Sequence, residues 1–248
     1  MTKQLNAHTT NNPKYKDQNF IDKYVMLWAY GYQNGLGAAE GLYRTINELG
    51  FSSLESNGNW HILDVGCGVG RTAADYASFF TNAEVLGIDA ASQMLDRAKS
   101  INLNSQGEIF SVDMRQAGFG SMSLKTRNLS NLKFAEYDLD AYGLTKPHPY
   151  DLITAVNLLD RLASVPGSLR TLFNLLVSGG VLICCTPLNF AAASEWGSYG
   201  SPEKIIELIR SIGFTIESHF DGLPYREILD SRGAYEEYPT LILKAIKP

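Results

Sequence analysis

The sequence predicts an α/β fold with a doubly wound, mostly parallel seven-stranded sheet, a reversed last strand and an N-terminal helical cap. Short apolar runs alternate with helical patterns from residue 61 onward, which is typical of strands joined by helical crossovers. A glycine-rich turn follows the first of these runs. The last two runs are joined by residues 220–239, which show no helical pattern, so we expect the final strand to be reversed.

The elements follow in order along the chain. Residues 1–19 are polar and predict an arm, and apolar residues at helical spacing over 20–49 predict a cap of two helices with a glycine-rich break. Residues 102–131 indicate an irregular inserted loop. We expect strands at 61–65, 84–88, 132–137, 151–156, 181–186, 214–219 and 240–245. We expect helices at 71–80, 92–99 and 168–176, the last of them closed by Gly179-Gly180. A fourth helix is expected after Ser201, which caps it; Pro202 is its first residue and Gly213 ends it.

Composition limits the class of protein. The chain has 248 residues, of which 45% are hydrophobic and 19% charged, so one large domain with a full core is expected. We assign 1–58 to the arm and cap and 59–248 to a ligand-binding domain. The net charge of −5 disfavours nucleic acid as a partner. Three cysteines, a polar N-terminus and no apolar stretch of about 20 residues predict a cytoplasmic protein without a membrane segment.

The strongest local signal is the segment Asp64-Val-Gly-Cys-Gly-Val-Gly70, where the first strand meets the first helix of the sheet domain. Ligands of doubly wound sheets bind at such carboxyl ends, although tight turns of this kind also occur without a ligand. Asp89 ends the second strand 19 residues after Gly70, where a carboxylate can accept hydrogen bonds from ribose hydroxyls or cap the next helix. The glycines are spaced G-x-G-x-G rather than G-x-G-x-x-G, and Asp64 suits a cationic amino acid tail better than a pyrophosphate.

Taken in order, these motifs resemble those of class I S-adenosylmethionine-dependent methyltransferases, which have a Rossmann-like fold. The resemblance covers roughly residues 60–190 and implies S-adenosylmethionine as the cofactor. It also implies that Asp89 binds the ribose, that Asp138 at the end of the third strand reads the adenine, and that Asn157 after the fourth strand lies near the methionine moiety. The cofactor-binding residues implied are Asp64, Gly66, Cys67, Gly68, Gly70, Asp89, Ala90, Met94, Asp138, Leu139 and Asn157.

Methyl transfer makes few demands on catalytic side chains. A sulfonium methyl is already electrophilic, so much of the acceleration can come from holding a nucleophile in line at ~3–3.5 Å. A general base is needed only if the nucleophile arrives protonated with a high pKa. We therefore assign no catalytic residue. The four histidines are interpreted as structural or solvated, and no pair has metal-ligand spacing, so no metal is expected.

Four clusters are candidates for binding a small-molecule acceptor. The first comes from the N-terminal arm and helix, and the second follows the fourth strand, where Asp160-Arg161 could instead be an exposed pair. The third follows the fifth strand, and the fourth lies in the connection before the last strand, where a lid loop is expected. The candidates are Tyr15, Tyr24, Asp160, Arg161, Asn189, Trp196, Tyr225 and Arg226.

A narrower likeness concerns the acceptor. The segments Asn157-Leu-Leu-Asp-Arg-Leu162 and Leu223-Pro-Tyr-Arg-Glu227 resemble parts of the methyltransferase domain of ovothiol biosynthesis, which implies a thiolated histidine methylated at a ring nitrogen. Two other classes remain open. One is a nicotinamide-dependent oxidoreductase, although the glycine spacing and Asp64 argue against this class. The other is a protein that binds S-adenosylmethionine without methylating, as a regulator or a different catalyst. The sequence does not indicate an oligomeric state.

Overall fold

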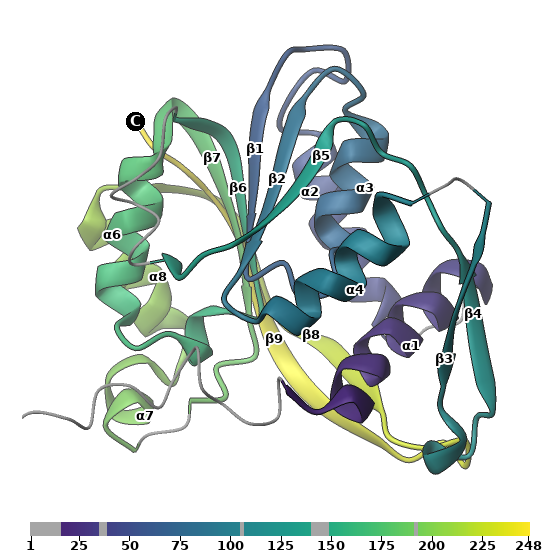
Figure 1. The fold of residues 1–248 in the computed structure, drawn as a ribbon. Helices are drawn as coiled ribbons and strands as arrows, with labels where there is room; N and C mark the ends of the chain where they lie inside the picture. Colours follow the sequence, from purple (N-terminus) through teal and green to yellow (C-terminus); the bar gives the residue numbers. More distant parts are fainter. Residues whose placement is uncertain (1–15, 35–38, 105–106, 140–148, 191–192) are drawn as a thin grey trace, which may run out of the picture.

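The chain is organised around a seven-stranded sheet with helices on both faces (Figure 1). This computed structural model describes residues 16–34, 39–104, 107–139, 149–190 and 193–248. The strands are β1 (His61–Val65), β2 (Glu84–Asp89), β5 (Leu132–Glu136), β6 (Tyr150–Val156), β7 (Leu176–Thr186), β8 (Thr215–Ile228) and β9 (Tyr235–Ile246). Their order is β5-β2-β1-β6-β7-β9-β8, and β9 runs antiparallel to the other six strands. The predicted fold, including the reversed last strand, is confirmed.

Two layers of helices cover the sheet. One face is covered by α2 (Glu40–Phe51), α3 (Arg71–Phe79) and α4 (Ser92–Asn102), with α1 (Gln18–Asn34) packed beside α4 (Figure 1). The other face is covered by α6 (Val165–Leu175) and α8 (Pro202–Ile212), and the short α7 (Ala193–Tyr199) packs against α8. Each face has its own apolar core, and successive strand residues alternate between them. Cys185 packs into the core under α1–α4, whereas Cys184 packs into the core under α6 and α8.

Serine side chains cap two of the helices. Ser201 caps α8 by accepting a hydrogen bond from the Lys204 N–H, and α8 stops before Gly213, as predicted. The helix expected at 168–176 instead begins at Val165, because the Ser164 side chain caps it by accepting from the Gly167 N–H. The Gly179-Gly180 pair, expected to close that helix, lies within β7, where the register with β6 shifts.

The segment predicted as an irregular loop contains a second, smaller sheet. β3 (Ile109–Asp113) and β4 (Ser121–Lys125) form an antiparallel hairpin that lies beside α1 (Figure 1). Val112 and Leu124 are its buried strand residues, and most of the others are exposed. Phe110 and Val112, and Met122 and Leu124, do alternate with polar residues, but each run spans only five residues and lies among serines, asparagines and glycines that indicate a loop.

The last two strands are much longer than predicted, and the expected lid loop is part of them. β8 and β9 pair from Thr215↔Ile246 to Ile228↔Tyr235, with register shifts between Ile216 and Ser218 and between Phe220 and Leu223. The sequence pattern fails here because Pro224 and Pro239 lie opposite each other and many neighbouring positions are charged. α7 was not predicted either. The far end of this hairpin meets the β3–β4 connection, where the Ser231 N–H donates to the Ala117 carbonyl.

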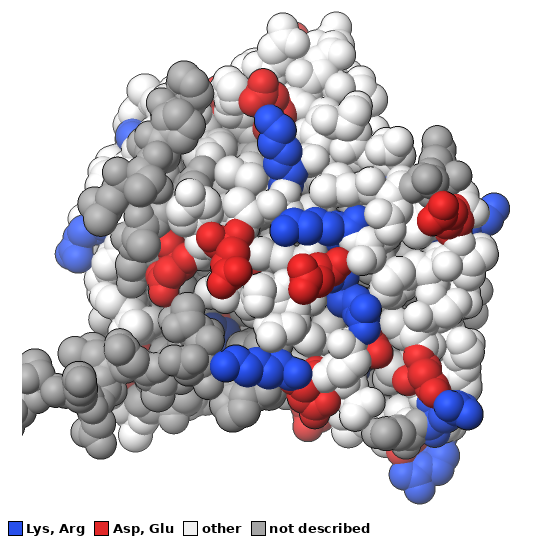
Figure 2. Space-filling view, in the orientation of Figure 1, with Lys and Arg blue, Asp and Glu red and all other residues white. Residues whose placement is uncertain are grey.

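Charges are mixed on the face drawn in Figure 2. Lysines and arginines there lie among aspartates and glutamates, and no broad basic area forms among the described residues visible on that face. This distribution agrees with the acidic net charge and offers no footprint for a phosphate backbone on the side shown. Within the described ranges, no helix has the length and apolar character needed to span a bilayer.

Candidate active site

A cavity of about 330 Å³ lies at the carboxyl ends of β1, β2, β5 and β6, which is a volume typical of small-molecule sites. One end is formed by the glycine turn, and the other by α1, α2 and the β8–β9 hairpin. Of the residues predicted to bind the cofactor, all but Gly70 line this cavity, namely Asp64, Gly66, Cys67, Gly68, Asp89, Ala90, Met94, Asp138, Leu139 and Asn157. Of the predicted acceptor residues, Tyr24, Arg161 and Tyr225 line it.

The backbone of the glycine turn forms part of the cavity wall. Gly66 and Gly68 have φ values of +67° and +54°, which L side chains rarely adopt. The amides of Gly66 and Cys67 both donate to the Ile88 carbonyl, at 2.8 and 3.0 Å, which fixes the turn to the end of β2. A Cβ at Gly66 would lie 2.8 Å from the Leu158 side chain, whereas a Cβ at Gly68 would meet nothing within 4 Å. Gly68 therefore leaves its space to the cavity.

Gly70 has a different role from the one predicted. It is the N-cap residue of α3, with φ +85°, and a Cβ there would lie 2.7 Å from the Phe134 ring. Its conformation lets the chain enter α3 while that ring packs closely beneath the turn. Gly70 therefore shapes the site without lining it.

Asp89 connects the glycine turn to the next helix. One carboxylate oxygen accepts from the Gly68 N–H at 2.9 Å, and the other accepts from the Ala91 N–H at 2.8 Å, just before α4. Burial raises the pKa of this carboxyl, and the backbone hydrogen bonds act in the opposite direction. Each carboxylate oxygen can accept more than one hydrogen bond, so the group can order the turn and still accept from a ligand in the cavity.

Asp64 is buried beneath the turn and joins three elements. Its carboxylate accepts from the Thr154 hydroxyl of β6 at 2.6 Å and from the Ala73 N–H of α3 at 3.1 Å. Burial raises its pKa to about 7, against an ordinary value of 3.8. The structure thus gives Asp64 an anchoring role, and its predicted contact with a cationic tail stays a prediction.

The raised pKa of Asp64 predicts a stability effect. Between the ordinary pKa of 3.8 and about 7, the folded protein binds more protons at Asp64 than the unfolded chain does, so this group lowers the free energy of unfolding as pH rises. We expect Asp64→Asn to lose less stability between about pH 5 and pH 8 than the wild type, as measured by urea unfolding without cofactor. Parallel pH profiles for the two proteins would contradict the assignment.

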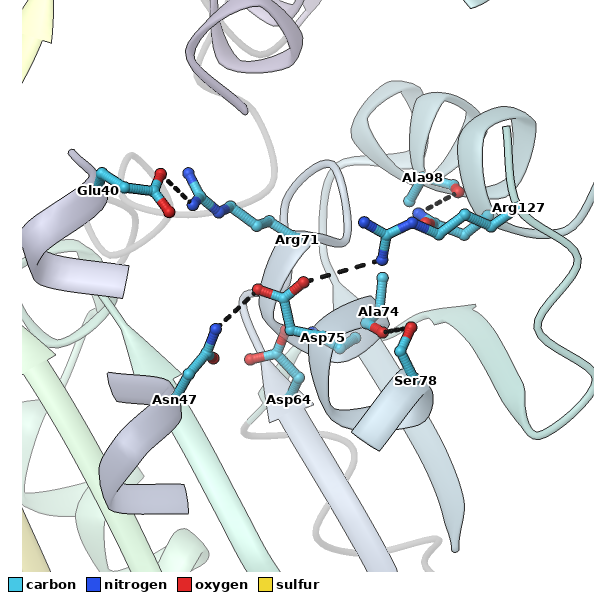
Figure 3. Close-up of polar contacts among 11 residues, drawn as sticks. Glu40, Asn47, Asp64, Arg71, Ala74, Asp75, Ser78, Ala98 and Arg127 are labelled. Carbon is cyan, nitrogen blue, oxygen red and sulfur yellow. Dashed lines mark hydrogen bonds and ion pairs between the residues drawn. The ribbon is translucent and has the colours of Figure 1, made fainter. Parts of the chain in front are cut away.

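Arg71 is a cavity residue that the sequence interpretation missed. It follows the glycine turn as the first residue of α3, and its Nη2 lies 2.8 Å from Glu40 Oε2 on α2 (Figure 3). Its guanidinium also lies 3.9 Å from the centre of the Tyr43 ring, a cation–π distance. Figure 3 shows a second link between the cap and the sheet domain, in which Asp75 accepts from Asn47 and faces Arg127. Its position directly after the glycine turn is the feature of the sequence from which Arg71 could have been predicted to line the cavity.

At the other end of the cavity, the cap meets the β8–β9 hairpin. Lys23 of α1 lies 2.7 Å from Glu227 of β8, and the Tyr225 hydroxyl donates to the same carboxylate at 3.0 Å. These side chains, Tyr24 and Tyr238 all line the cavity. Glu227, Glu236 and Tyr238 were not predicted because they face the cavity only when residues 223–239 form a hairpin, and a loop was expected there. Lys23 was not predicted because its partner Glu227 lies 204 residues away in the sequence.

Several predicted acceptor residues lie away from the cavity. Asp160 is buried rather than part of an exposed pair, 3.5 Å from Arg161, and burial raises its pKa to about 6. Arg226 is on the opposite side of β8 from Tyr225, because successive strand residues alternate, and it pairs with Glu237. Trp196 donates from its indole to the Phe190 carbonyl at 2.7 Å and does not line the cavity, nor does Asn189. Tyr15 lies outside the described residues.

Asn157 marks the point where the chain leaves β6. Its φ of +51° is tolerated by asparagine more readily than by most residues, and its N–H donates to the Cys185 carbonyl at 2.8 Å. The Cys185 thiol in turn lies 3.3 Å from the Asn157 side-chain oxygen. The turn is therefore fixed to β7, and it places Asn157 on the cavity wall. In the described part of the chain, no group of three His, Cys, Asp or Glu side chains is arranged to hold a metal ion.

A cavity bordered by this glycine turn, on a sheet of this order, defines the class of Rossmann-like methyltransferases. A family model described as a methyltransferase domain matches residues 38–219, and the chain belongs to this family. The match confirms the predicted class and indicates S-adenosylmethionine as the cofactor. It favours a methyltransferase over a nicotinamide-dependent oxidoreductase.

Two curated relatives are methyltransferases. O-methyltransferase resE of Aspergillus sclerotiorum is 28% identical over 178 residues, 70% of this chain and 61% of that protein. Trans-aconitate 2-methyltransferase of Methylobacterium radiotolerans is 32% identical over 129 residues, 52% of this chain and 38% of that protein. The match therefore spans less than two thirds of either relative.

Solved structures share the fold. A TehB-like S-adenosylmethionine-dependent methyltransferase of Corynebacterium glutamicum aligns with a TM-score of 0.58 and 17% identity, covering 94% of this chain and all of that one. The [4+2]-cyclase SpnF aligns with a TM-score of 0.54 and 18% identity, covering 83% of this chain and 80% of that one. At such identities the likeness concerns the fold alone, and a cyclase among the neighbours means that the fold does not fix the reaction.

Proposed function

We propose that the chain transfers a methyl group from S-adenosylmethionine to nitrogen, oxygen or sulfur of a small-molecule acceptor. The observation that supports this most directly is the continuity of the cavity. It runs from the glycine turn and Asp89 to the tyrosines of the cap and of β8, so one space can hold a cofactor and an acceptor together. In this proposal residues 1–58 are the arm and cap, and residues 59–248 bind the cofactor.

The residues at the glycine turn suit the nucleoside end of the cofactor. The missing Cβ of Gly68 leaves room for close approach of a ligand to the backbone. Asp89 is placed to accept from the ribose hydroxyls, and Asp138, on the same wall, to accept from the adenine amino group. Asp64 and Arg71 border the inner end, where a zwitterionic amino acid tail needs one group of each sign. When bound, the cofactor supplies an electrophilic methyl group.

The remaining residues orient the acceptor. Tyr24 and Tyr225 contribute to the wall at the cap, and Arg161 contributes a cation beside Asn157. Because a sulfonium methyl needs little activation, their work is to hold the nucleophile in line and to exclude water. The two segments that resemble the ovothiol methyltransferase domain both border this end of the cavity, through Arg161 and Tyr225. We therefore name a thiolated histidine, methylated at a ring nitrogen, as the first acceptor to test.

A transfer assay tests this function. The protein is incubated with methyl-labelled S-adenosylmethionine and either a thiolated L-histidine or L-histidine, and labelled products are identified by mass spectrometry. We expect label in the thiolated compound and little in histidine. If neither is labelled, the same assay on a small-molecule extract identifies another acceptor. Binding of S-adenosylhomocysteine without labelling of any extract component would favour a protein that binds the cofactor without methylating.

A further inference from the structure

One face of the β8–β9 hairpin presents two tyrosines and two glutamates to the cavity. Tyr225 lies opposite Tyr238 in the strand register, and Glu227 lies opposite Glu236. Because side chains two residues apart share a face of a strand, these four point the same way, and all four line the cavity. We call them the Tyr–Glu face.

Hydrogen bonds and ring packing order this face. The Tyr225 hydroxyl donates to Glu227 at 3.0 Å, and the Tyr238 hydroxyl donates to Glu236 at 2.7 Å. The two rings stack with centroids 6.3 Å apart and an interplanar angle of 27°. The hydrogen bond to Glu236, first, and then burial raise the pKa of Tyr238 to about 12, so its phenol remains a donor at neutral pH. Each carboxylate is thus held beside an aromatic ring.

Among the described residues, the two glutamates of the Tyr–Glu face share one cation at ion-pair distance. Like charges directly opposite each other on neighbouring strands destabilise a sheet. Within the described ranges, Lys23 is the one cation at ion-pair distance from either glutamate, 2.7 Å from Glu227. Arg161 lines the same cavity and lies close enough to Tyr238 to act on its pKa, but among the described residues its ion pair is with Asp160, at 3.5 Å. On the other side of the same hairpin, Arg226 and Glu237 pair one to one.

We propose that the Tyr–Glu face binds a cationic nitrogen of the methyl acceptor, so that the substrates are small organic ammonium compounds. Carboxylates supply charge-assisted acceptors for an ammonium group, and tyrosine faces attract cations. A carboxylate or phosphate at the same place would face two glutamates. This inference rests on the proposed function, because it puts the acceptor at the cap end of the cofactor cavity.

Binding of matched probes to the complex with S-adenosylhomocysteine tests the inference. The probes are L-histidine, histamine and tyramine, each compared with its N-acetyl derivative, in which the ammonium charge is removed and the ring is kept. We expect calorimetry to show binding of at least one amine and no measurable binding of its acetylated form. Failure of all three amines to bind better than their acetylated forms would overturn the proposal.

Single substitutions test which glutamates bind the ammonium group. Glu227→Gln is expected to weaken binding of the amine about tenfold, because the substitution removes a half-buried negative charge and leaves Lys23 without its partner. Glu236→Gln should weaken binding of the amine less, since the Glu236 side chain is exposed and its charge is screened by solvent. The matched control is Glu237→Gln, on the outer side of the hairpin, which should leave the affinity unchanged. Equal affinities in all four proteins would contradict the placement.

The cofactor measurement separates this inference from the proposed function. S-adenosylhomocysteine is titrated into each variant first, and all should bind it as the wild type does. If the wild type fails to bind it, the proposed function fails. If it binds and the amines show no preference over their acetylated forms, only the inference about the acceptor fails.

Discussion

Replacing Asp89 with alanine is expected to weaken binding of S-adenosylhomocysteine by about 1–3 kcal/mol, roughly 5–150-fold in the dissociation constant. The proposed function gives this carboxylate two charge-assisted hydrogen bonds to the ribose. The structure adds a second reason, since the same group accepts from the Gly68 amide at 2.9 Å and so orders the glycine turn. Both effects act in the same direction, and isothermal titration calorimetry measures their sum.

Asp96→Ala is the matched control for this substitution. Asp96 is an exposed carboxylate on α4, the helix that begins directly after Asp89, and it does not line the cavity. The same net charge is removed from the protein in both variants, so general electrostatic effects are equal. Wild-type affinity in Asp96→Ala together with wild-type affinity in Asp89→Ala would refute the ribose assignment.

Replacing Gly68 with valine should abolish detectable cofactor binding while leaving the sheet intact. A side chain at this position would enter the cavity, where the glycine now leaves open space. The φ of +54° adds a backbone strain of about 1–3 kcal/mol for a β-branched residue. Calorimetry measures the binding, and circular dichroism with thermal melting measures the fold.

The strain can be separated from the steric block with a second glycine. Gly233, in the turn between β8 and β9, has φ +90° and open space around its missing Cβ, and it does not line the cavity. Gly233→Val should therefore lower the melting temperature by an amount similar to Gly68→Val and keep the affinity of the wild type. A Gly68→Val protein that binds S-adenosylhomocysteine normally would show that the cofactor does not approach this turn.

The central part of the fold could be predicted because its signals are local and strong. β1, β6 and β7 are apolar runs buried on both faces, and a strand of that kind needs no partner information to be recognised. The turn from Gly66 to Gly70 is marked by glycines at positions where the backbone requires positive φ. The glycine-turn end of the cavity follows from these two features.

The cap end of the cavity could not be predicted, because it depends on pairing between strand segments that lack an apolar pattern. Tyr225 and Arg226 are neighbours in the sequence and looked equivalent, but in β8 one faces the cavity and the other the opposite side. Lys23 and Glu227 meet only because α1 lies over the far end of that hairpin. Asp160 looked exposed beside Arg161, and its burial comes from the packing around the end of β7, which no local pattern reports.

Titration of the unmodified protein with S-adenosylhomocysteine, and in parallel with NAD, tests the account most directly. The geometry of the glycine turn and of Asp89 predicts saturable binding of S-adenosylhomocysteine to one site per chain and no binding of NAD. Binding of NAD, or no heat with S-adenosylhomocysteine from a folded protein, would contradict it.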